Sequence, residues 1–162
     1  DVIDGSVDEQ RRLIKQFGHL ARHLVAPVWH MSLSIDWLLE MADGYERFCF
    51  GSSGAYWQVG SESWCRRADE AWNELTKRGH RCWVHMMRGL SLCGDKYPFA
   101  SADSTNVARN FKNKGAEVCP ERMARRIDAI QSPLQWTVRE TQVDLFERSS
   151  KWESVTQKNV RV

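Results

Sequence analysis

The sequence predicts an α/β fold made of parallel βα units, about five strands of a partial (β/α) barrel of the TIM type. Short apolar segments alternate along the chain with longer amphipathic segments, which is the pattern of buried parallel strands and their crossover helices. A closed barrel of eight strands needs about 250 residues, so a chain of 162 residues would carry rather more than half of one. An open five-stranded sheet is the alternative, and its apolar edges would need to be covered.

The expected strands and helices follow from these segments and from the residues that flank them. Strands are expected at residues 1–5, 26–31, 47–53, 81–87 and 98–102. Helices are expected over 7–24, 34–44, 61–79, 104–114 and 119–130, with one more within 132–150. Ser6, Ser34 and Ser61 precede the first three helices, and a serine hydroxyl there can accept a free N–H of the first turn.

Composition indicates one domain that does not enter a membrane. Hydrophobic residues make up 42% and charged residues 27% of the chain, which is ordinary for a globular protein. No apolar run approaches the length of about 18 residues that a membrane span needs. We expect one partial barrel over residues 1–150, a frayed tail over 151–162, and a cytoplasmic location. The chain starts without Met and with a polar, acidic segment, so it looks like a piece of something longer rather than a chain with a signal peptide.

The five cysteines are widely spaced and include no C-x-C or C-x-x-C pair. A disulfide framework or a compact zinc site would need closer spacing or an even count. We therefore expect reduced thiols packed as small core residues, and neither a metal nor another cofactor.

Positive charge is concentrated late in the chain. Six basic residues stand against two acidic ones between positions 109 and 126, a local net charge of +4, namely Arg109, Lys112, Lys114, Arg122, Arg125 and Arg126 against Glu117 and Glu121. Such a segment is either a solvated helix face or a surface that meets phosphates.

Every expected strand ends in polar or glycine residues. These are Asp4 after the first strand, His30 after the second, Gly51, Ser52, Ser53 and Gly54 after the third, His85, Met86, Arg88 and Gly89 around the end of the fourth, and Asp103 after the fifth. Each alone could be a helix cap or a turn residue. Because the carboxyl ends of parallel strands meet at one edge, where ligands bind in such folds, the whole set predicts a site.

Two carboxylates, Asp4 and Asp103, are the most economical catalytic pair at this edge. Two acids on opposite sides of a glycosidic bond can divide the work of nucleophile and acid/base. Ser104 or Thr105 can cap the helix that follows, which leaves Asp103 free to point into the site. No G-x-S-x-G is present, so no serine nucleophile is proposed. His30 and His85 could ligate a metal, but no carboxylate stands at ligand spacing.

Taken in their order along the chain, these motifs resemble those of the tRNA-guanine transglycosylase superfamily. The likeness is greatest to its DNA-directed branch, the deoxypurine-in-DNA protein A (7-deazaguanine DNA transglycosylase) family of viruses and mobile elements. It covers roughly residues 1–114 and rests on the order of the strand ends rather than on long identity.

The resemblance is carried residue by residue. Asp4 of "DVIDG" matches the family's purine-contacting Asp, and His30 of "PVWHM" matches its base-reading polar residue. "FGSSG" matches the glycine-rich strand end whose backbone touches the base, and "WVHMMRG" offers Met86 or Met87 to stack on it. "FASADSTNVARN" matches the nucleophilic Asp with Asp103, followed by the family's Arg-Asn pair. The family's cysteine and histidine zinc site has no counterpart, and the linker that precedes "FASAD" is short enough for a barrel helix to be reduced or lost.

The resemblance implies base exchange. A guanine would be flipped out of DNA (tRNA being the second choice), cut from its sugar through an Asp103-linked intermediate and replaced by a 7-deazapurine. Arg109, Lys112 and Lys114 would then hold flanking phosphates. The remaining barrel strands would come from a missing half or from a second copy of the chain. If a virus encodes the protein, the expected cytoplasmic location is the cytoplasm of its host. A non-catalytic nucleic-acid-binding or assembly subunit that keeps the same edge is the alternative. An aldolase-type lyase is less favoured, because no expected strand ends in Lys.

Overall fold

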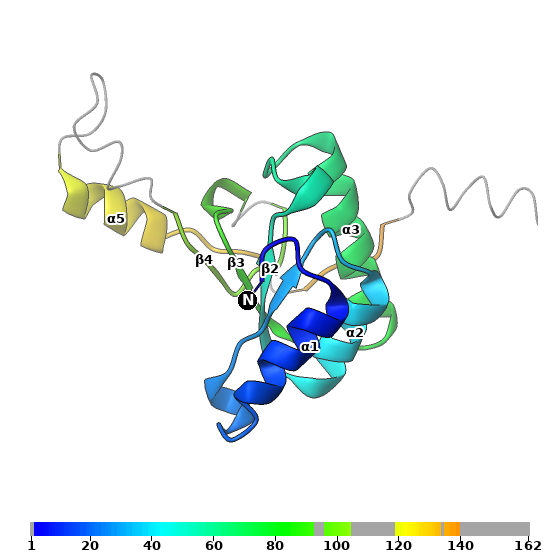
Figure 1. The fold of residues 1–162 in the computed structure, drawn as a ribbon. Helices are drawn as coiled ribbons and strands as arrows, with labels where there is room; N and C mark the ends of the chain where they lie inside the picture. The colour runs from blue at the N-terminus through cyan, green and yellow to red at the C-terminus, as the bar shows by residue number, and fades with distance from the viewer. Residues whose placement is uncertain (1, 93–95, 105–118, 134, 140–162) are drawn as a thin grey trace, which may run out of the picture.

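The structure, a computed structural model, describes residues 2–92, 96–104, 119–133 and 135–139 and shows an α/β fold around a parallel sheet (Figure 1). Its four strands are β1 (Val28–His30), β2 (Arg47–Gly51), β3 (Trp83–Met86) and β4 (Ser101–Ala102), and they lie in the order β1-β2-β3-β4. The described helices are α1 (Val7–Gln16), α2 (Ile35–Gly44), α3 (Glu62–Lys77) and α5 (Pro120–Asp128), with short 3₁₀ turns η1 (Arg22–Leu24), η2 (Gly54–Tyr56) and η3 (Leu90–Leu92). Each strand therefore pairs with its neighbour in sequence, and all pairs are parallel.

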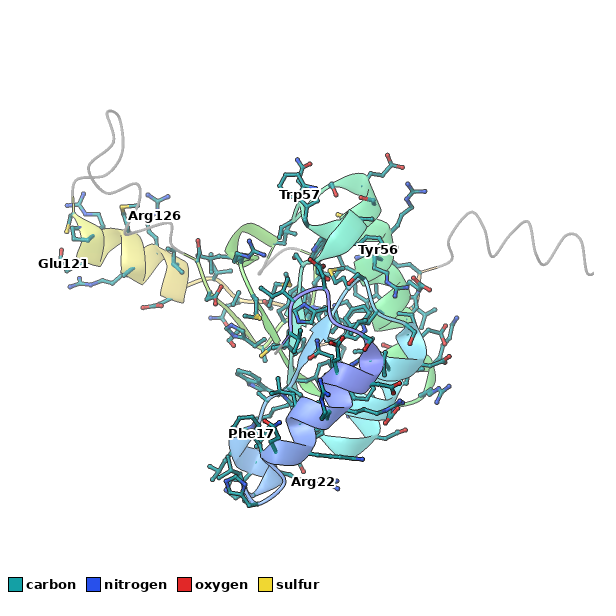
Figure 2. All side chains as sticks on the ribbon, in the orientation of Figure 1. Phe17, Arg22, Tyr56, Trp57, Glu121 and Arg126 are labelled. Atoms are coloured by element: carbon teal, nitrogen blue, oxygen red, sulfur yellow. The ribbon has the colours of Figure 1, made fainter. Side chains whose placement is uncertain are left out.

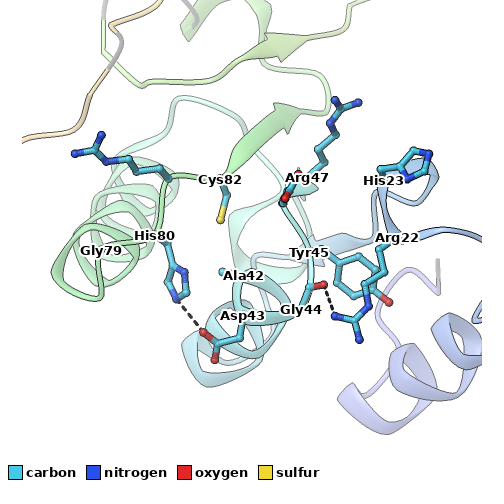
Figure 3. A pocket seen from close by; sticks show the side chains of 12 residues that line it. Arg22, His23, Ala42, Asp43, Gly44, Tyr45, Arg47, Gly79, His80 and Cys82 are labelled. Atoms are coloured by element: carbon cyan, nitrogen blue, oxygen red, sulfur yellow. Dashed lines mark hydrogen bonds and ion pairs between the residues drawn. The ribbon is translucent and has the colours of Figure 1, made fainter.

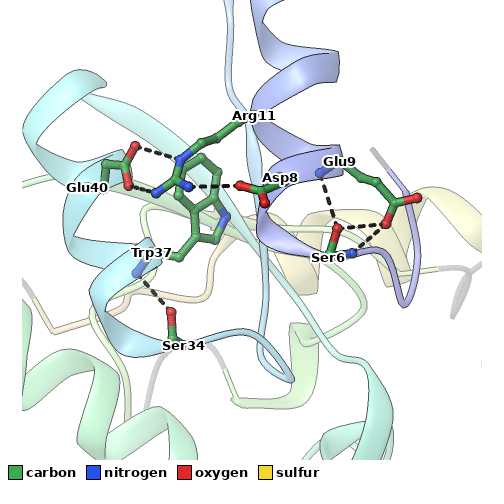
Figure 4. A network of polar contacts seen from close by, with 7 residues as sticks. All are labelled: Ser6, Asp8, Glu9, Arg11, Ser34, Trp37 and Glu40. Carbon is green, nitrogen blue, oxygen red and sulfur yellow. Dashed lines mark hydrogen bonds and ion pairs between the residues drawn. The ribbon is translucent and has the colours of Figure 1, made fainter.

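The helix starts that the sequence predicts are confirmed. Ser6 forms a capping box with Glu9: its hydroxyl accepts the Glu9 N–H at 3.3 Å, and the Glu9 carboxylate accepts the Ser6 N–H at 2.7 Å (Figure 4). The hydroxyls of Ser34 and Ser61 each accept a first-turn N–H at 3.2 Å, at the starts of α2 and α3. Such a contact stabilises a helix end by about 1 kcal/mol.

Arg11 ties α1 to α2. Its guanidinium donates to the carboxylate of Glu40 and lies over the indole of Trp37, with 5.1 Å from its central carbon to the ring centroid (Figure 4). Asp8 on the same helix accepts from Arg11 at 3.2 Å. The hydrogen bond from Arg11 lowers the pKa of Glu40. These contacts hold the two helices side by side on the same side of the sheet.

One face of the sheet is fully buried beneath α2 and α3. The side chains on it alternate with those of the other face and are inaccessible to solvent, namely Trp29, Phe48, Phe50, Val84 and Met86. Phe50 lies at the centre of an aromatic cluster, with its ring centroid 4.9 Å from that of Trp29 and 5.7 Å from that of Phe99. This cluster is the hydrophobic core, and it holds the strands in register.

On the opposite face, here called the second face, His30 is buried at the edge, whereas five side chains of β2, β3 and β4 are half-buried or exposed. They are Arg47, Cys49, Trp83, His85 and Ser101. The register places Cys49 opposite His85, and His85 opposite Ser101, so these residues form one row across three strands. A parallel sheet is normally covered on both faces. The polar groups that concern function lie on this second face.

Two expected elements differ in the structure. Residues 2–5 form a turn rather than the end of a strand, with the Gly5 N–H donating to the Val2 carbonyl at 3.1 Å and Asp4 in the left-handed region at φ 59°. A strand requires a neighbour for its main-chain groups, whereas Asp tolerates the left-handed region. The prediction of a strand there is wrong for these residues, and the described sheet has four strands rather than five.

The first helix ends at Gln16 rather than at residue 24. Gly18 follows its last turn, the Phe17 N–H donates to the Ile14 carbonyl at 3.0 Å, and the chain turns before η1. Glycine destabilises a helix interior, which explains the early end. The helix expected over 119–130 is confirmed as α5. The helix expected over 104–114 and most of residues 132–150 lie outside the described residues, and residues 135–139 are not helical.

Helix α5 lies apart from the helices that cover the sheet, and none of its residues is buried (Figures 1 and 2). Glu121 and Arg126 project from it in Figure 2. Among the described residues, no helix combines the length and the apolarity that crossing a bilayer would demand.

Candidate active site at the carboxyl edge of the sheet

Asp103 lies at the carboxyl edge of the sheet, directly after β4, and its two carboxylate oxygens face different partners. Oδ1 accepts the main-chain N–H of Arg88 at 2.6 Å. Oδ2 lies 3.7 Å from Nε2 of His85. The Asp103 side chain is 55% exposed, so a substrate can reach it. A carboxylate that is held at one oxygen and accessible to solvent is suited to act as a nucleophile or as an acid/base.

Arg88 connects Asp103 to the end of β2. Its backbone is in the left-handed region at φ 60°, a conformation uncommon for a residue with a side chain. This conformation directs its N–H toward Asp103, while its guanidinium donates to the carbonyl of Ser52 at 3.4 Å. One residue therefore joins the ends of three neighbouring strands.

His85 is the other neighbour of Asp103, and its ring is held by contacts on the second face. Its Nδ1 lies 2.6 Å from the hydroxyl oxygen of Ser101 on the paired strand. Its ring stacks on that of Trp83 at an interplanar angle of 12°, and Arg47 lies over the same indole. The ring is therefore oriented by its neighbours before any ligand binds.

Ser101 was missed by sequence reasoning. It lies in β4 two residues before Asp103, and residues two apart in extended backbone share a face. That spacing could have placed Ser101 beside Asp103, but its contact with His85 depends on the register between β3 and β4. No local pattern contains that register.

The glycine-serine segment 51–54 is packed tightly rather than open. A Cβ on Gly51 would lie 2.9 Å from a Val28 methyl and 3.2 Å from Nδ1 of His30, so the His30 ring lies against this glycine. Gly54 has a φ of 53°, and a Cβ there would lie 2.9 Å from the Cβ of Ser32. The close approach of the His30 ring accounts for the glycine at position 51, and the left-handed backbone beside Ser32 accounts for the one at position 54.

The serine hydroxyls of this segment make internal hydrogen bonds. The hydroxyl of Ser52 accepts the indole N–H of Trp64 at 3.0 Å in the interior. The hydroxyl of Ser53 lies 2.8 Å from that of Ser32. Both therefore position the loop, and the groups that this segment could offer a ligand are those of its main chain.

His30 is buried at the end of β1, with 4% of its surface exposed. Burial lowers the pKa of His30, and the carboxylate of Asp4 acts in the opposite direction. Asp4 therefore lies near the carboxyl end of β1 even though it belongs to a turn. The pairing of Asp4 with Asp103 across a glycosidic bond remains a prediction.

Met86 is not at the accessible edge. Its side chain is fully buried on the helix-covered face, and a Cβ on Gly89 would lie 2.2 Å from its Cγ. Met87, the next residue, is half-buried, and its N–H donates to the Phe50 carbonyl at 3.0 Å. Of the two methionines, Met87 is therefore the one that a ligand could contact.

The other expected ligands are distributed as follows. Arg109, Lys112 and Lys114 lie outside the described residues. Within the described ranges, no cluster of His, Cys, Asp or Glu side chains could hold a metal ion. Burial raises the pKa of the Cys49 thiol, and the nearby Asp103 carboxylate raises it further.

A cavity of about 610 Å³ opens at the opposite, amino-terminal edge of the sheet (Figure 3). Two of its basic side chains contact the end of α2: Arg22 donates to the Gly44 carbonyl at 3.0 Å, and His80 lies 3.2 Å from Asp43 (Figure 3). Basic groups near helix carboxyl ends satisfy free carbonyls and oppose the helix dipole. We therefore assign this cavity a structural role and place the candidate site at the other edge, where parallel α/β folds bind ligands.

Comparison of the chain with family models, with curated proteins and with solved structures gave no match.

Proposed function

We propose that this chain is part of a (β/α) barrel of the guanine transglycosylase type, which replaces guanine in DNA with a 7-deazapurine. The observation that carries the proposal is the position of Asp103 at the carboxyl edge, with its Oδ1 held by the Arg88 N–H and its side chain 55% exposed. A barrel of this kind is supported by the strand order, which advances in one direction without the reversal of doubly wound sheets. The remaining strands would come from another half of the barrel or from a second copy.

The proposed reaction proceeds by two displacements at one carbon of the sugar. A carboxylate oxygen of Asp103 attacks C1′ of the flipped nucleotide, and the bond to guanine breaks with its electron pair going to the base, which takes up a proton. The incoming 7-deazapurine loses its ring N–H proton and attacks the same carbon, and the bond to Asp103 then breaks. Neither step needs an oxidant or a reductant.

The surrounding residues support binding of a purine and of phosphates. Main-chain groups of segment 51–54 and the guanidinium of Arg88, which contacts this segment, lie at the same edge of the sheet as Asp103 and offer donors and acceptors to a base edge. Arg122, Arg125 and Arg126 are exposed on α5. With Arg109, Lys112 and Lys114 in the same basic part of the chain, they are suited to flanking phosphates.

One observation favours the non-catalytic alternative, a nucleic-acid-binding or assembly subunit. Met86 is fully buried on the helix-covered face, away from the accessible edge. The stacking of Met86 on a base, which was expected of the base-exchange site, is therefore not available. A subunit that keeps the edge but not the chemistry would bind DNA and form no covalent bond to it.

The test is covalent capture by the full chain. The protein is incubated with duplex DNA and 7-deazaguanine, the mixture is separated on denaturing gels, and base exchange is followed with labelled guanine. We expect an adduct with wild type and none with Asp103→Asn, while Asp36→Asn, an exposed carboxylate in the first turn of α2, serves as the matched control. An adduct that persists in Asp103→Asn refutes the nucleophile. DNA binding without any adduct supports the non-catalytic alternative.

A further inference from the structure

We infer that Ser101 selects the tautomer of His85 that presents Nε2–H to Asp103, and that this pair holds the Asp103 carboxylate for attack. The first half concerns the unliganded protein alone. The second half rests on the proposed function, because it concerns a reaction of Asp103. Ser101 and His85 are positioning residues in this scheme, and they act through Asp103.

The geometry aligns these three side chains on neighbouring strands. His85 and Ser101 are directly paired across β3 and β4, and Asp103 stands two residues after Ser101, immediately beyond the end of β4. The distance from Ser101 Oγ to His85 Nδ1 is 2.6 Å, and the distance from His85 Nε2 to Asp103 Oδ2 is 3.7 Å. The imidazole therefore lies between the hydroxyl and the carboxylate, with one ring nitrogen directed at each.

The hydroxyl and the carboxylate impose different demands on the ring nitrogens. A carboxylate only accepts hydrogen bonds, so a bare Nε2 lone pair facing Asp103 would be repelled, whereas Nε2–H would be attracted. In a neutral imidazole with Nε2–H, Nδ1 is an acceptor. Ser101 can rotate its hydroxyl to donate to that nitrogen. The arrangement is satisfied by one tautomer, Nε2–H, with the Ser101 O–H donating to Nδ1.

The other groups around His85 leave this choice undisturbed. Trp83 stacks on the ring and limits its rotation, while the Arg47 guanidinium lies over that indole, 6.0 Å from the ring centroid. Cys49 is the paired residue on the β2 side, and burial raises the pKa of its thiol, so it brings no competing anion. Arg88 reaches Asp103 through its main chain, at the oxygen that His85 does not face.

The consequence for the proposed reaction is orientation of the nucleophile. The Arg88 N–H already donates to Oδ1. The distance of 3.7 Å between His85 Nε2 and Oδ2 is too long for a hydrogen bond, so a small closing movement is needed before Nε2–H donates to Oδ2. With a donor at each oxygen, the plane of the carboxylate is fixed while lone pairs remain for attack on C1′. Misplacement of a reacting group by about 1 Å can cost about 100-fold in rate.

The first measurement reads the tautomer in the full chain without any ligand. ¹⁵N-histidine-labelled protein is studied by long-range proton–nitrogen NMR at about pH 8.5, two units above the ordinary imidazole pKa of about 6.5. We expect a pure Nε2–H pattern for His85 in wild type, a mixture of tautomers in Ser101→Ala, and the pure pattern again in Ser101→Thr. Ser63→Ala, which removes a hydroxyl in α3, is the control and leaves the His85 pattern as in wild type. Unchanged His85 signals in a folded Ser101→Ala protein would overturn the inference.

The second measurement reads the rate of adduct formation with duplex DNA. We expect Ser101→Ala to slow it by about 10- to 100-fold and Ser101→Thr to recover most of the loss. Adduct formation by Ser101→Ala at the wild-type rate would overturn the positioning role. Covalent labelling of Ser101 by a fluorophosphonate would also overturn it, because it would show that Ser101 is itself a nucleophile. If wild type forms no adduct while the tautomer changes as expected, the proposed function and the positioning role fail and the tautomer assignment stands.

Discussion

Asn73 in α3 accepts a hydrogen bond from the indole N–H of Trp136 at 2.8 Å, across 63 positions of the chain. The same oxygen accepts the main-chain N–H of Arg139 at 2.9 Å, and the Asn73 amide donates back to the Arg139 carbonyl at 2.7 Å. Asn73 is 4% exposed, and Trp136 stacks on Tyr97 with their rings 10° from parallel. A single buried amide therefore fastens residues 135–139 onto the helical layer.

Replacing Asn73 with Ala should destabilise the protein. The change removes its three hydrogen bonds and leaves the Trp136 N–H buried without its acceptor. We expect the free energy of unfolding to fall by about 2–4 kcal/mol, as measured by urea denaturation. Arg66→Ala, at an exposed position of the same helix, should change it by no more than about 0.5 kcal/mol. A loss of under about 1 kcal/mol for Asn73→Ala would mean that these contacts contribute little.

Tyr97 should make the protein sensitive to alkali. Burial, and then the hydrogen bond to Asp69 at 2.9 Å, raise the pKa of Tyr97 above its ordinary value. Above about pH 10 the unfolded chain loses this proton while the folded chain keeps it, so stability should fall by about 1.4 kcal/mol per pH unit. Below that pH the contribution is fully present.

The matching variant is Tyr97→Phe, compared with wild type by denaturation at several pH values. At neutral pH it should be less stable by about 1 kcal/mol because the hydrogen bonds of the hydroxyl are lost. Above about pH 10 its stability should decline less steeply than that of wild type. Parallel curves for the two proteins would show that Tyr97 does not carry the alkaline effect.

Asp4 should control the titration of His30. Burial lowers the pKa of His30 and the Asp4 carboxylate partly offsets this effect. Asp4→Asn should therefore lower the pKa of His30 further, as followed by NMR titration of the ring. Asp8→Asn removes a nearby exposed carboxylate and should leave the His30 titration unchanged. An upward shift with Asp4→Asn would contradict the placement of Asp4 near β1.

The same pKa predicts a loss of stability in acid. Because the folded-state pKa of His30 is lowered, the unfolded chain binds the proton more readily once the pH falls below about 6.5. Stability from this residue is thus present above that pH and declines below it. Asp4→Asn should steepen the decline, which denaturation between about pH 7 and pH 5 would measure.

Gly51 should not tolerate a side chain. A Cβ there would meet a Val28 methyl at 2.9 Å and Nδ1 of the buried His30 at 3.2 Å. We expect Gly51→Ala to cost about 1–3 kcal/mol through overpacking. Gly44→Ala is the matched control: nothing lies within 4 Å of its Cβ position, and it ends a helix, so it should be neutral or slightly stabilising. Equal effects at both glycines would contradict the close packing at Gly51.

The elements set by local signals could be predicted from the sequence. Ser6, Ser34 and Ser61 each start a helix as expected, because a cap depends on residues within one turn. The cores of the four described strands were likewise found from their apolar segments. The turn at residues 2–5 was not, because a strand forms only where a partner is available, and partners are chosen by the whole fold.

The sequence predicted that the polar strand ends share one edge of the parallel sheet, but not the contacts between their side chains. Met86 shares a face with the buried Val84, so the period of two already indicated that it belongs to the core. The contact between Ser101 and His85, by contrast, arises from pairing across strands. The expected pairing of Asp4 with Asp103 across a glycosidic bond and the expected contact of Arg109 with phosphate remain predictions.

The anchor of Asp103 is an amide of the peptide backbone. Arg88 supplies the hydrogen bond with its main-chain N–H, not with its side chain. Every amino acid except proline carries that group, so many residue types at position 88 could keep the hydrogen bond to the Asp103 carboxylate. Glycine would even adopt the left-handed backbone conformation of this position without strain. Homologues could therefore differ freely at this position while keeping the same anchor, and a survey of conserved side chains would overlook it.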